Sequence, residues 1–397
     1  MSAESLRPVI VGAGVAGLAA GIALSQRGIH TLTLEKAPGA KPTGGGLQLG
    51  PNAVRILDAL GVGDAIRAAA GHPQALVMRS LSTGRRLGRL ALGQRTMNRY
   101  KAPYLTILRS DLSRILLEAH TSAGLEIRRD HVLQSTRQTQ EGVALTFASQ
   151  ISINAPWAIG ADGLWSRMRA SLPAASEPQA AGQTAVRAVV PLAQVQESHC
   201  ISVHTAPGRH LVTYPVQGGT ALALVAIVPS LEQQSPGWGT PVEAMALLHA
   251  LSPLPEALRE RILTAPEWLA WPLCAAPPVQ GAAAQALGRV ALIGDAAHPM
   301  RPHLAQGAAM GLEDAMVLAN CLSANNAGDP SMALSQFAAL RWRRNAAIQA
   351  RAIRAGRIFQ LSGPLAWGRN LALSLLSETL MDQPDIYAYD ARHVGTV

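Results

Sequence analysis

Three glycines near the start of the chain have the spacing that lets a backbone approach a phosphate. Gly12, Gly14 and Gly17 directly follow the apolar run 8–11 and precede 18–26, which has helix-forming composition. In a strand–turn–helix unit, the first glycine permits the turn, the second lets a pyrophosphate come close, and the third lets the helix pack on the strand. The helix N-terminus then faces the phosphate charge. The pattern predicts a dinucleotide site.

An acidic residue supports this interpretation. Glu35 follows a second predicted strand, Thr31-Leu-Thr-Leu34, at about the ~20-residue offset expected for a carboxylate that accepts hydrogen bonds from the hydroxyls of a ribose. An acid at this place disfavours a 2′-phosphate on that ribose. A glycine-rich turn alone is common as a plain structural turn, but the strand, the helix and the acid together favour dinucleotide binding.

Two later signatures lie far along the chain. They are Gly160-Ala-Asp162-Gly163 in the middle and Gly294-Asp295 near the end, the latter after the apolar run 289–293. Together with the first signature they indicate one site assembled from distant segments.

The elements that must position these residues form an α/β pattern. A Rossmann-like unit at the N-terminus is followed, from about residue 183 to 280, by strand-like runs separated by Pro and Gly and by one helical stretch at 242–262. We therefore expect a Rossmann-like domain interrupted by a mostly antiparallel sheet domain, with helices at the C-terminus. The first domain is assigned residues 1–73, 101–182 and 281–397, and the second is assigned 74–100 and 183–280.

Several local predictions accompany this division. Residues 76–100 are expected to form strands, and the helix ending near Ala119 is expected to be capped by Ser110 or Asp111. A helix is predicted at 307–322, and another at 331–360 is expected to expose its arginines to solvent before a short tail. The arginines are Arg341, Arg343, Arg344, Arg351, Arg354 and Arg357.

Length and composition indicate a sizeable two-domain enzyme. The 397 residues exceed the roughly 250–300 at which single cores usually divide, and 48% are apolar. No apolar stretch approaches the ~18 residues of a membrane span, and the N-terminus has no basic region followed by an apolar segment. We therefore expect a cytoplasmic protein.

Charge and cysteine content limit the kinds of ligand and partner that we expect. The formal charge is +9, yet only 4% of residues are aromatic and no basic run is interleaved with them, so nucleic acid is not an expected partner. An anionic substrate and a pyrophosphate-bearing cofactor explain the excess. Cys200, Cys274 and Cys321 are widely separated, with no spacing for a disulfide framework or a metal site.

These motifs in this order resemble the class A, single-component flavoprotein monooxygenases, the family of salicylate, 3-hydroxybenzoate and 6-hydroxynicotinate hydroxylases. The resemblance covers almost the whole chain. It includes the stretch 45–52, Arg109 with Asp111, 160–169, 294–302, Gln306-Gly307 and 311–314.

The resemblance implies a glutathione-reductase-type FAD-binding domain. It also implies NADH or NADPH as co-substrate, oxygen transfer through a flavin C4a-hydroperoxide, and a phenolic or heteroaromatic substrate that carries a carboxylate. Lys36 and Lys41 stand where many relatives carry arginine, which leaves the choice of nicotinamide cofactor open. The FAD-binding positions implied are Gly12, Gly14, Ala16, Gly17, Glu35, Lys36, Gln48, Arg109, Asp162, Gly163, Asp295, Pro302, Gly307 and Ala308.

A phenolic substrate needs a base or hydrogen-bond acceptor near its hydroxyl. His210 is the first candidate, because His210, Val212 and Tyr214 alternate along a strand and share the face that roofs the site in this family. Tyr214 and His303 complete the candidate catalytic set. A histidine on a strand is more often a satisfied core or surface residue, and that alternative stays open.

Other functions also stay open. A related enzyme could epoxidise or tailor a larger or non-aromatic scaffold, and a catalytically idle FAD-binding protein would carry the same signatures. Signatures of serine hydrolases, zinc proteases and P-loop nucleotide enzymes are absent from the sequence. The sequence leaves open which ring is modified, at which position, whether carboxylate is lost, and whether the protein is a homodimer.

Overall fold

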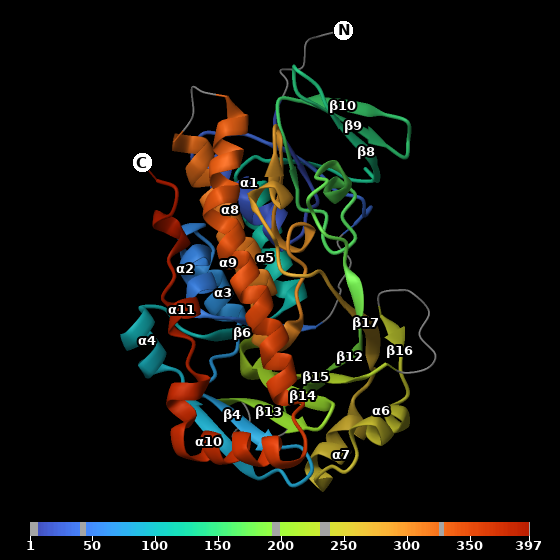
Figure 1. Ribbon diagram of the computed structural model, residues 1–397, viewed down its shortest axis with the longest axis vertical. Coiled ribbons are helices and arrows are strands. Elements are labelled where there is room, and N and C mark those ends of the chain that lie inside the picture. The colour runs from blue at the N-terminus through green and yellow to red at the C-terminus, as the bar shows by residue number, and fades with distance from the viewer. Residues whose placement is uncertain (1–6, 40–44, 193–198, 231–238, 325–328, 397) are drawn as a thin grey trace.

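The computed structural model describes residues 7–39, 45–192, 199–230, 239–324 and 329–396. Its upper half in Figure 1 is built on a six-stranded sheet in the order β18-β19-β11-β1-β2-β7. Five of these strands, β19, β11, β1, β2 and β7, pair in parallel, so the carboxyl ends of segments from distant parts of the chain lie at one edge of the sheet. The strands are β1 (Val9–Val11), β2 (Leu32–Leu34), β7 (Glu126–Arg128), β11 (Ala158–Gly160), β18 (Ala286–Leu287) and β19 (Val290–Leu292).

One helix connects the first two strands and is buried almost all round. Helix α1 (Val15–Ser25) is composed almost entirely of alanine, glycine and aliphatic residues, and most of these are buried. It packs against α5 (Arg109–Ser122) and α8 (Gly307–Ala324). A helix with apolar residues on every side is stable only in such a sandwiched position.

The lower half is an eight-stranded sheet in the order β16-β17-β12-β15-β14-β13-β4-β5, antiparallel except for the pair β13 and β4. Two separate parts of the chain supply it, as Figure 1 shows by the blue and green-to-yellow strands. The strands are β4 (Ala75–Ser80), β5 (Arg86–Ala91), β12 (Gln179–Pro191), β13 (Cys200–Ala206), β14 (Arg209–Val216), β15 (Ala221–Pro229), β16 (Thr240–Pro241) and β17 (Leu269–Ala275).

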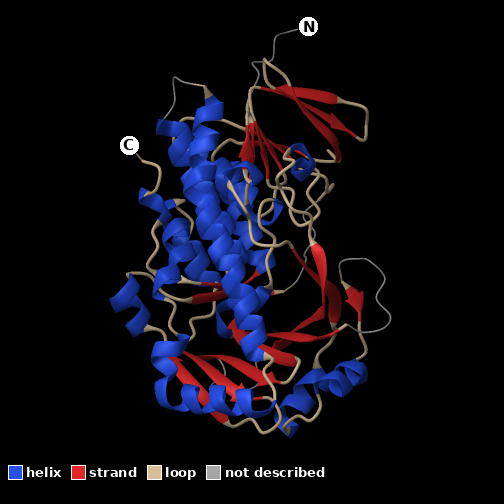
Figure 2. Cartoon of the chain, in the orientation of Figure 1, coloured by secondary structure: helices blue, strands red, loops and turns tan. Residues whose placement is uncertain are grey.

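Long helices join the two halves. Helix α9 (Pro330–Phe359) packs on α8 and runs from the upper sheet to the lower one (Figure 2). Helix α10 (Gly363–Met381) then packs against β5, at the far edge of the eight-stranded sheet. The cavity described below lies between these helices and the two sheets.

The remaining elements cover the sheets or connect them. The two small sheets pair β3 (Gly46–Leu49) with β6 (Leu105–Leu108), and β8 (Leu133–Gln138), β9 (Val143–Phe147) and β10 (Ser152–Ala155) with one another. The other α-helices are α2 (Pro51–Ala59), α3 (Gly63–Ala69), α4 (Gln94–Tyr100), α6 (Ala244–Leu251), α7 (Glu256–Thr264) and α11 (Pro384–Tyr387).

The predicted fold class is confirmed, and several local predictions were wrong. Residues 94–100 form a helix, and the stretch 242–262 is two helices separated at Pro253 and Pro255. Neither Ser110 nor Asp111 caps α5, which begins at Arg109 without a side-chain cap. The expected short tail contains the 19-residue helix α10. The domain boundaries stay a prediction.

Candidate functional site

A cavity of about 560 Å³ lies where the two halves meet. The turn after β1, the N-terminal end of α8 and one face of the eight-stranded sheet all contribute to its wall. Twelve residues that the sequence identified as site candidates line it. They are Gly14, Ala16, Gln48, Arg109, Gly163, His210, Tyr214, Asp295, Pro302, His303, Gly307 and Ala308.

The N-terminal glycines divide into two kinds. A β-carbon on Gly17 would overlap the carbonyl oxygen of Gly12, and one on Gly12 would overlap the carbonyl of Ala161, so these two glycines permit close packing of the turn. A β-carbon on Gly14 would meet nothing within 4 Å. Because α1 starts at Val15 with no side-chain cap, its first N–H groups point to this open space. The turn therefore fits a pyrophosphate.

Besides Gly12 and Gly17, three of the expected cofactor residues, Glu35, Lys36 and Asp162, do not line the cavity. The carboxylate of Glu35 accepts hydrogen bonds from the N–H groups of Ala13 (2.7 Å) and Ala37 (2.8 Å), which fixes it next to the glycine turn. Lys36 is exposed, and Lys41 falls outside the described residues. Asp162 accepts hydrogen bonds from the Ser166 hydroxyl and the N–H groups that follow it, so it orders its own loop.

A buried arginine fastens the middle signature to the late one. Arg169 is 1% exposed, and its guanidinium donates to the carbonyls of Leu164, Asp295 and Ala296 at 2.9–3.0 Å. This contact leaves the exposed Asp295 carboxylate at the cavity wall. The sequence pointed to this residue only as part of the motif 160–169.

The late signature leads into the start of α8. Pro302 begins a short 3-10 turn that ends at Ala305, which adopts a left-handed conformation with φ of 53°. Gly307 and Ala308 follow as the first residues of α8, and both line the cavity. The unpaired N–H groups and positive end of this helix suit a site for negative charge.

A second site for negative charge was not identified from the sequence. Arg187 lines the cavity, its guanidinium lies 4.3 Å from the ring centre of Trp271, and its buried Nε has no hydrogen-bond partner among the described residues. Burial lowers its pKa to about 10, and nearby Arg109 acts in the same direction. An arginine inside the apolar run 185–190 is the signal that could have found it.

The three predicted catalytic residues all line the cavity. His210 and His303 come from β14 and from the turn before α8, and their ring centres lie 5.2 Å apart. The ring of Phe359 packs edge-on against both, at 5.5 and 6.3 Å. Tyr214 lies further along β14, against Gly46, where any β-carbon would overlap its ring.

Burial keeps these polar groups neutral. It lowers the pKa of His210 to about 3 and that of His303 to about 4, with smaller contributions from His303 and Arg301 respectively. It also raises the pKa of Tyr214 to about 12. Nδ1 of His210 and both ring nitrogens of His303 have no hydrogen-bond partner among the described residues. His210 and His303 therefore contribute neutral imidazoles to the cavity wall.

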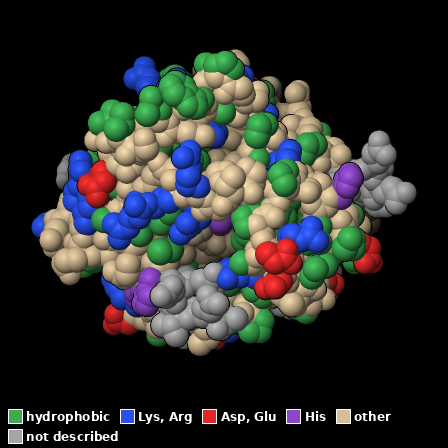
Figure 3. Space-filling view, turned by 90° about the horizontal axis from the view of Figure 1, so that it is seen from below, with side chains coloured by type: hydrophobic (Ala, Val, Ile, Leu, Met, Phe, Trp, Pro, Cys, Tyr) green, Lys and Arg blue, Asp and Glu red, His purple; other side chains and the backbone are tan. Residues whose placement is uncertain are grey.

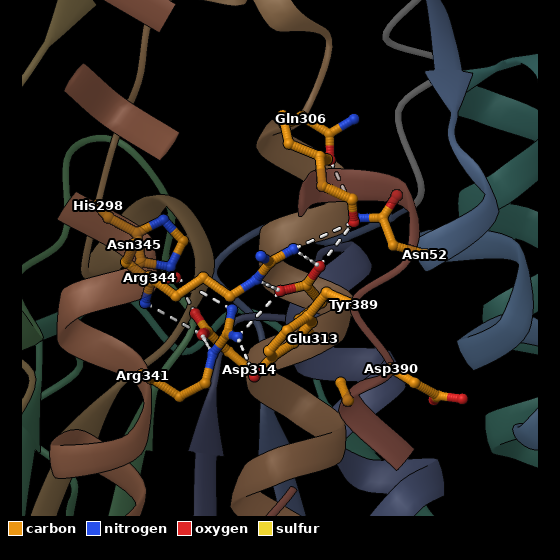
Figure 4. Close-up of polar contacts among 12 residues, drawn as sticks. Asn52, His298, Gln306, Glu313, Asp314, Arg341, Arg344, Asn345, Tyr389 and Asp390 are labelled. Carbon is orange, nitrogen blue, oxygen red and sulfur yellow. Dashed lines mark hydrogen bonds and ion pairs between the residues drawn. The ribbon is translucent and has the colours of Figure 1, made fainter. Parts of the chain in front are cut away.

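A buried ionic network supports the floor (Figure 4). Asp314 accepts hydrogen bonds from the N–H of Gly294 (3.0 Å), from Nε2 of His298 (2.5 Å) and from Nε of Arg341 (2.8 Å). Burial alone would raise the pKa of Asp314, but His298 and Arg341 hold it well below its usual range. Arg341, which the sequence analysis placed on a solvated face, is 0% exposed.

The neighbouring acid extends this network to α2. Glu313 is also 0% exposed, and it pairs with Arg341 and Arg344. Asn52 donates to both Glu313 (2.8 Å) and Gln306 (3.0 Å), the residue that precedes α8. The network therefore fixes the turn at Gly294 and the start of α8 relative to each other.

Two other classes of feature were searched for. Within the described residues, no cluster of three or more His, Cys, Asp or Glu side chains could hold a metal ion. No helix in the same part of the chain combines the length and the apolar composition that crossing a membrane requires.

Comparison with known proteins agrees with this geometry. Residues 6–352 match the family described as FAD binding domain. The chain is 33% identical to 3-hydroxybenzoate 6-hydroxylase 1 of Aquipseudomonas alcaligenes, covering 86% of each chain. It is 32% identical to 6-hydroxynicotinate 3-monooxygenase of Pseudomonas fluorescens, covering 87% of this chain and 90% of that one.

A solved structure extends the similarity to the whole fold. A salicylate hydroxylase substrate complex superposes with a TM-score of 0.80 at 26% identity, covering 97% of this chain and 96% of that one. The family match, the two relatives and the shared fold lead to one conclusion: the chain belongs to this FAD-binding family and is an FAD-dependent monooxygenase of the aromatic hydroxylase type.

Proposed function

We propose that this protein uses NADH or NADPH and molecular oxygen to hydroxylate a phenolic or heteroaromatic ring that carries a carboxylate. The observation that carries the proposal is the pair of neutral histidines, His210 and His303, that line the cavity with their ring centres 5.2 Å apart. FAD, when bound, supplies the activation of oxygen, and the protein supplies placement, charge and exclusion of water.

Residues on the cavity wall and in the adjacent glycine turn would bind FAD. The open space at Gly14 and the first turn of α1 would receive the pyrophosphate, with Arg109 beside it, and Glu35 would face the ribose. Gln48, Pro302, Gly307 and Ala308 would surround the ring system. The positive end of α8 would stabilise negative charge on that ring.

His210 would accept the hydrogen bond of the substrate hydroxyl. With a pKa of about 3 the imidazole is neutral at pH 7, so a ring nitrogen is available as an acceptor. Drawing the proton toward nitrogen raises electron density on the ring that is to be hydroxylated. A substrate phenolate formed beside the His210 imidazole would in turn favour the charged imidazolium form of His210.

Arg187 would pair with the carboxylate of the substrate. Its buried Nε has no partner in the described chain, and no acidic side chain is paired with it there. The Arg187 guanidinium would donate two parallel hydrogen bonds to a carboxylate that enters the cavity, the arrangement for which a guanidinium is suited. The two relatives named above act, by their names, on hydroxybenzoate and hydroxynicotinate, which are carboxylated rings.

A substrate panel tests the proposal. The FAD-loaded protein is mixed with hydroxybenzoates, hydroxynicotinates and quinolones, and the consumption of NADH and of NADPH is followed together with hydrogen peroxide. We expect at least one ring to stimulate nicotinamide oxidation without matching peroxide release, with a product heavier by one oxygen atom. Bound FAD with no stimulation by any ring would instead support the idle flavoprotein.

A further inference from the structure

One row of side chains crosses the cavity roof and joins five neighbouring strands. Arg187 of β12 lies opposite Val225 of β15, Val225 opposite Val212 of β14, Val212 opposite Val203 of β13, and Val203 opposite Met78 of β4. All five side chains line the cavity. Residues in register on adjacent strands point to the same face, so the five side chains form one continuous strip.

The strip has a charged end and a long apolar end. Arg187 is its only ionisable side chain, and the other four are aliphatic or thioether groups. With strands about 4.8 Å apart, the apolar part from Val225 to Met78 spans roughly 14 Å. That is longer than a single six-membered ring.

Helix α10 closes the apolar end. Met78 pairs with Gly88 of β5, and a β-carbon on Gly88 would lie 3.0 Å from Ser377 and 3.3 Å from Met381 of this helix. Leu373, Leu380 and Met381 of α10 also line the cavity. Leu380 lines the cavity and is also 48% exposed, so the apolar end leads to the surface at α10.

Arg369, the cation that α10 contributes to the cavity lining, is already engaged within the described residues. Arg369 of α10 donates to the carbonyls of Ile358 and Phe359 through Nη1 and to the Asn370 side chain through Nε and Nη2. The four side chains from Val225 to Met78 offer no N–H or O–H donor, so an apolar substituent along the strip would gain by burial.

The outer surface around α10 is apolar as well. Leu371 and Leu375 are 45% and 72% exposed on this helix, and neither lines the cavity. Figure 3 looks at this end of the molecule and shows hydrophobic side chains gathered beside arginine and lysine side chains. An apolar ligand would meet compatible surface at the point where the cavity approaches solvent.

We propose that the substrate is amphiphilic: its hydroxylated ring lies beside His210, and an apolar substituent extends along Val225, Val212, Val203 and Met78 toward α10. The inference rests on the proposed function for the position of the ring. It adds a ligand class, an aromatic acid with an alkyl or aryl arm, in place of a bare hydroxybenzoate or hydroxynicotinate.

A homologous series tests it. For each free ring position in turn, hydroxybenzoates that carry hydrogen, methyl, ethyl or propyl there are titrated into the FAD-loaded protein without nicotinamide, and Kd is read from the perturbed flavin absorbance. At one or more ring positions, those from which the arm extends along the strip, we expect Kd to fall about two- to fourfold for each added methylene. A Kd that is flat or rises with length at all ring positions overturns the inference.

Variants of α10 provide a matched pair. Leu380→Ser removes an apolar wall residue and should raise Kd for the propyl compound about tenfold, whereas Leu375→Ser, on the outer surface of the same helix, should leave it unchanged. Val203→Phe blocks the strip, so we expect it to weaken binding of the propyl compound more than that of the unsubstituted ring. Equal effects of Leu380→Ser and Leu375→Ser would contradict the inference.

The outcome separates the inference from the proposed function. If the unsubstituted ring perturbs the flavin and stimulates NADH oxidation but the arm has no effect, the inference fails and the proposed function stands. If no member of the series binds, the inference also fails. The substrate panel then decides whether the proposed function fails with it.

Discussion

At the scale of single residues, the two kinds of glycine in the first turn have separable roles. Gly17 serves the packing of the turn, whereas Gly14 faces open space. We expect Gly14→Ala to leave the thermal stability of the FAD-free protein unchanged while weakening FAD binding, because its methyl group occupies the space of the pyrophosphate. Loss of one charge-assisted hydrogen bond would raise Kd for FAD roughly 10- to 150-fold.

Gly17→Ala is the comparison variant for this prediction. It should destabilise the FAD-free protein itself, since its methyl group overlaps the backbone of Gly12. Thermal melts without FAD and fluorescence titration with FAD distinguish the two variants. Equal behaviour of both would contradict the assigned roles.

His210 carries the second prediction at this scale. His210→Ala should leave FAD bound and NADH consumption active, but hydrogen peroxide should replace the hydroxylated product, because the ring oxygen loses its acceptor. The rate of product formation should fall by about 10²-fold or more. His210→Gln keeps an acceptor and should recover part of the coupling, which a purely structural histidine would not explain.

At the scale of elements, the start of α8 depends on the buried network beneath it. Asp314 accepts hydrogen bonds from the N–H of Gly294 and from the side chains of His298 and Arg341. The side chains of Asp314, His298 and Arg341 are all 0% exposed. Asp314→Asn leaves Arg341 less compensated in the interior, which we expect to lower the free energy of unfolding by about 3–5 kcal/mol. Denaturant unfolding measures this change.

Glu118→Gln provides the control for that variant. Glu118 pairs with Arg114 on the exposed side of α5, so its loss should have little effect on unfolding. A comparable loss of stability in both variants would mean that the network does not hold α8. Because the network also fixes the turn at Gly294, FAD affinity should fall in Asp314→Asn alone.

Elements with one regular pattern were predictable from the sequence, and those with mixed surroundings were not. The run 8–11, the glycine turn and α1 follow from local periodicity, as do most strands of the large sheet. Helix α10 has apolar residues toward the cavity and toward solvent, so it shows no single hydrophobic face. Prolines at 253 and 255 divide the stretch 242–262 into two helices.

The site was predictable where its chemistry is local and hidden where it depends on tertiary contact. The glycine turn and the shared face of His210 and Tyr214 are properties of one segment. In the sequence, Arg187 and Arg341 have no feature that distinguishes them from other arginines of strands and helices. Only the fold shows that Arg187 packs against Trp271 and that Arg341 pairs with Asp314. The acids that compensate Arg341 lie 27 and 28 residues away, on another helix.

At the scale of the whole molecule, buried neutral histidines predict sensitivity to acid. Burial lowers the pKa of His120, His204 and His303 to about 4 and that of His210 to about 3. Their unfolded pKa is about 6.5, so the unfolded chain binds more protons between pH 6.5 and about 4. Stability should be full above pH 6.5 and should fall progressively down to about pH 4.

The expected loss, summed over the four histidines, is comparable with the stability of a typical domain. Each histidine contributes on the order of 1–3 kcal/mol, against a usual total of about 5–15 kcal/mol. Urea unfolding of the FAD-saturated protein at pH 7.5, 5.5 and 4.5 measures it. His204→Gln, away from the proposed site, should flatten this pH dependence, and unchanged stability between pH 7.5 and 4.5 would rule the explanation out.

The central claim is that the cavity formed by both halves of the molecule directs one oxygen atom from dioxygen onto an aromatic ring. The most direct measurement is mass spectrometry of the product formed under isotopically labelled dioxygen with NADH and the best ring of the panel. We predict one labelled oxygen atom per product molecule. A product labelled only from water, or nicotinamide oxidation that yields peroxide with every ring tested, would contradict the claim.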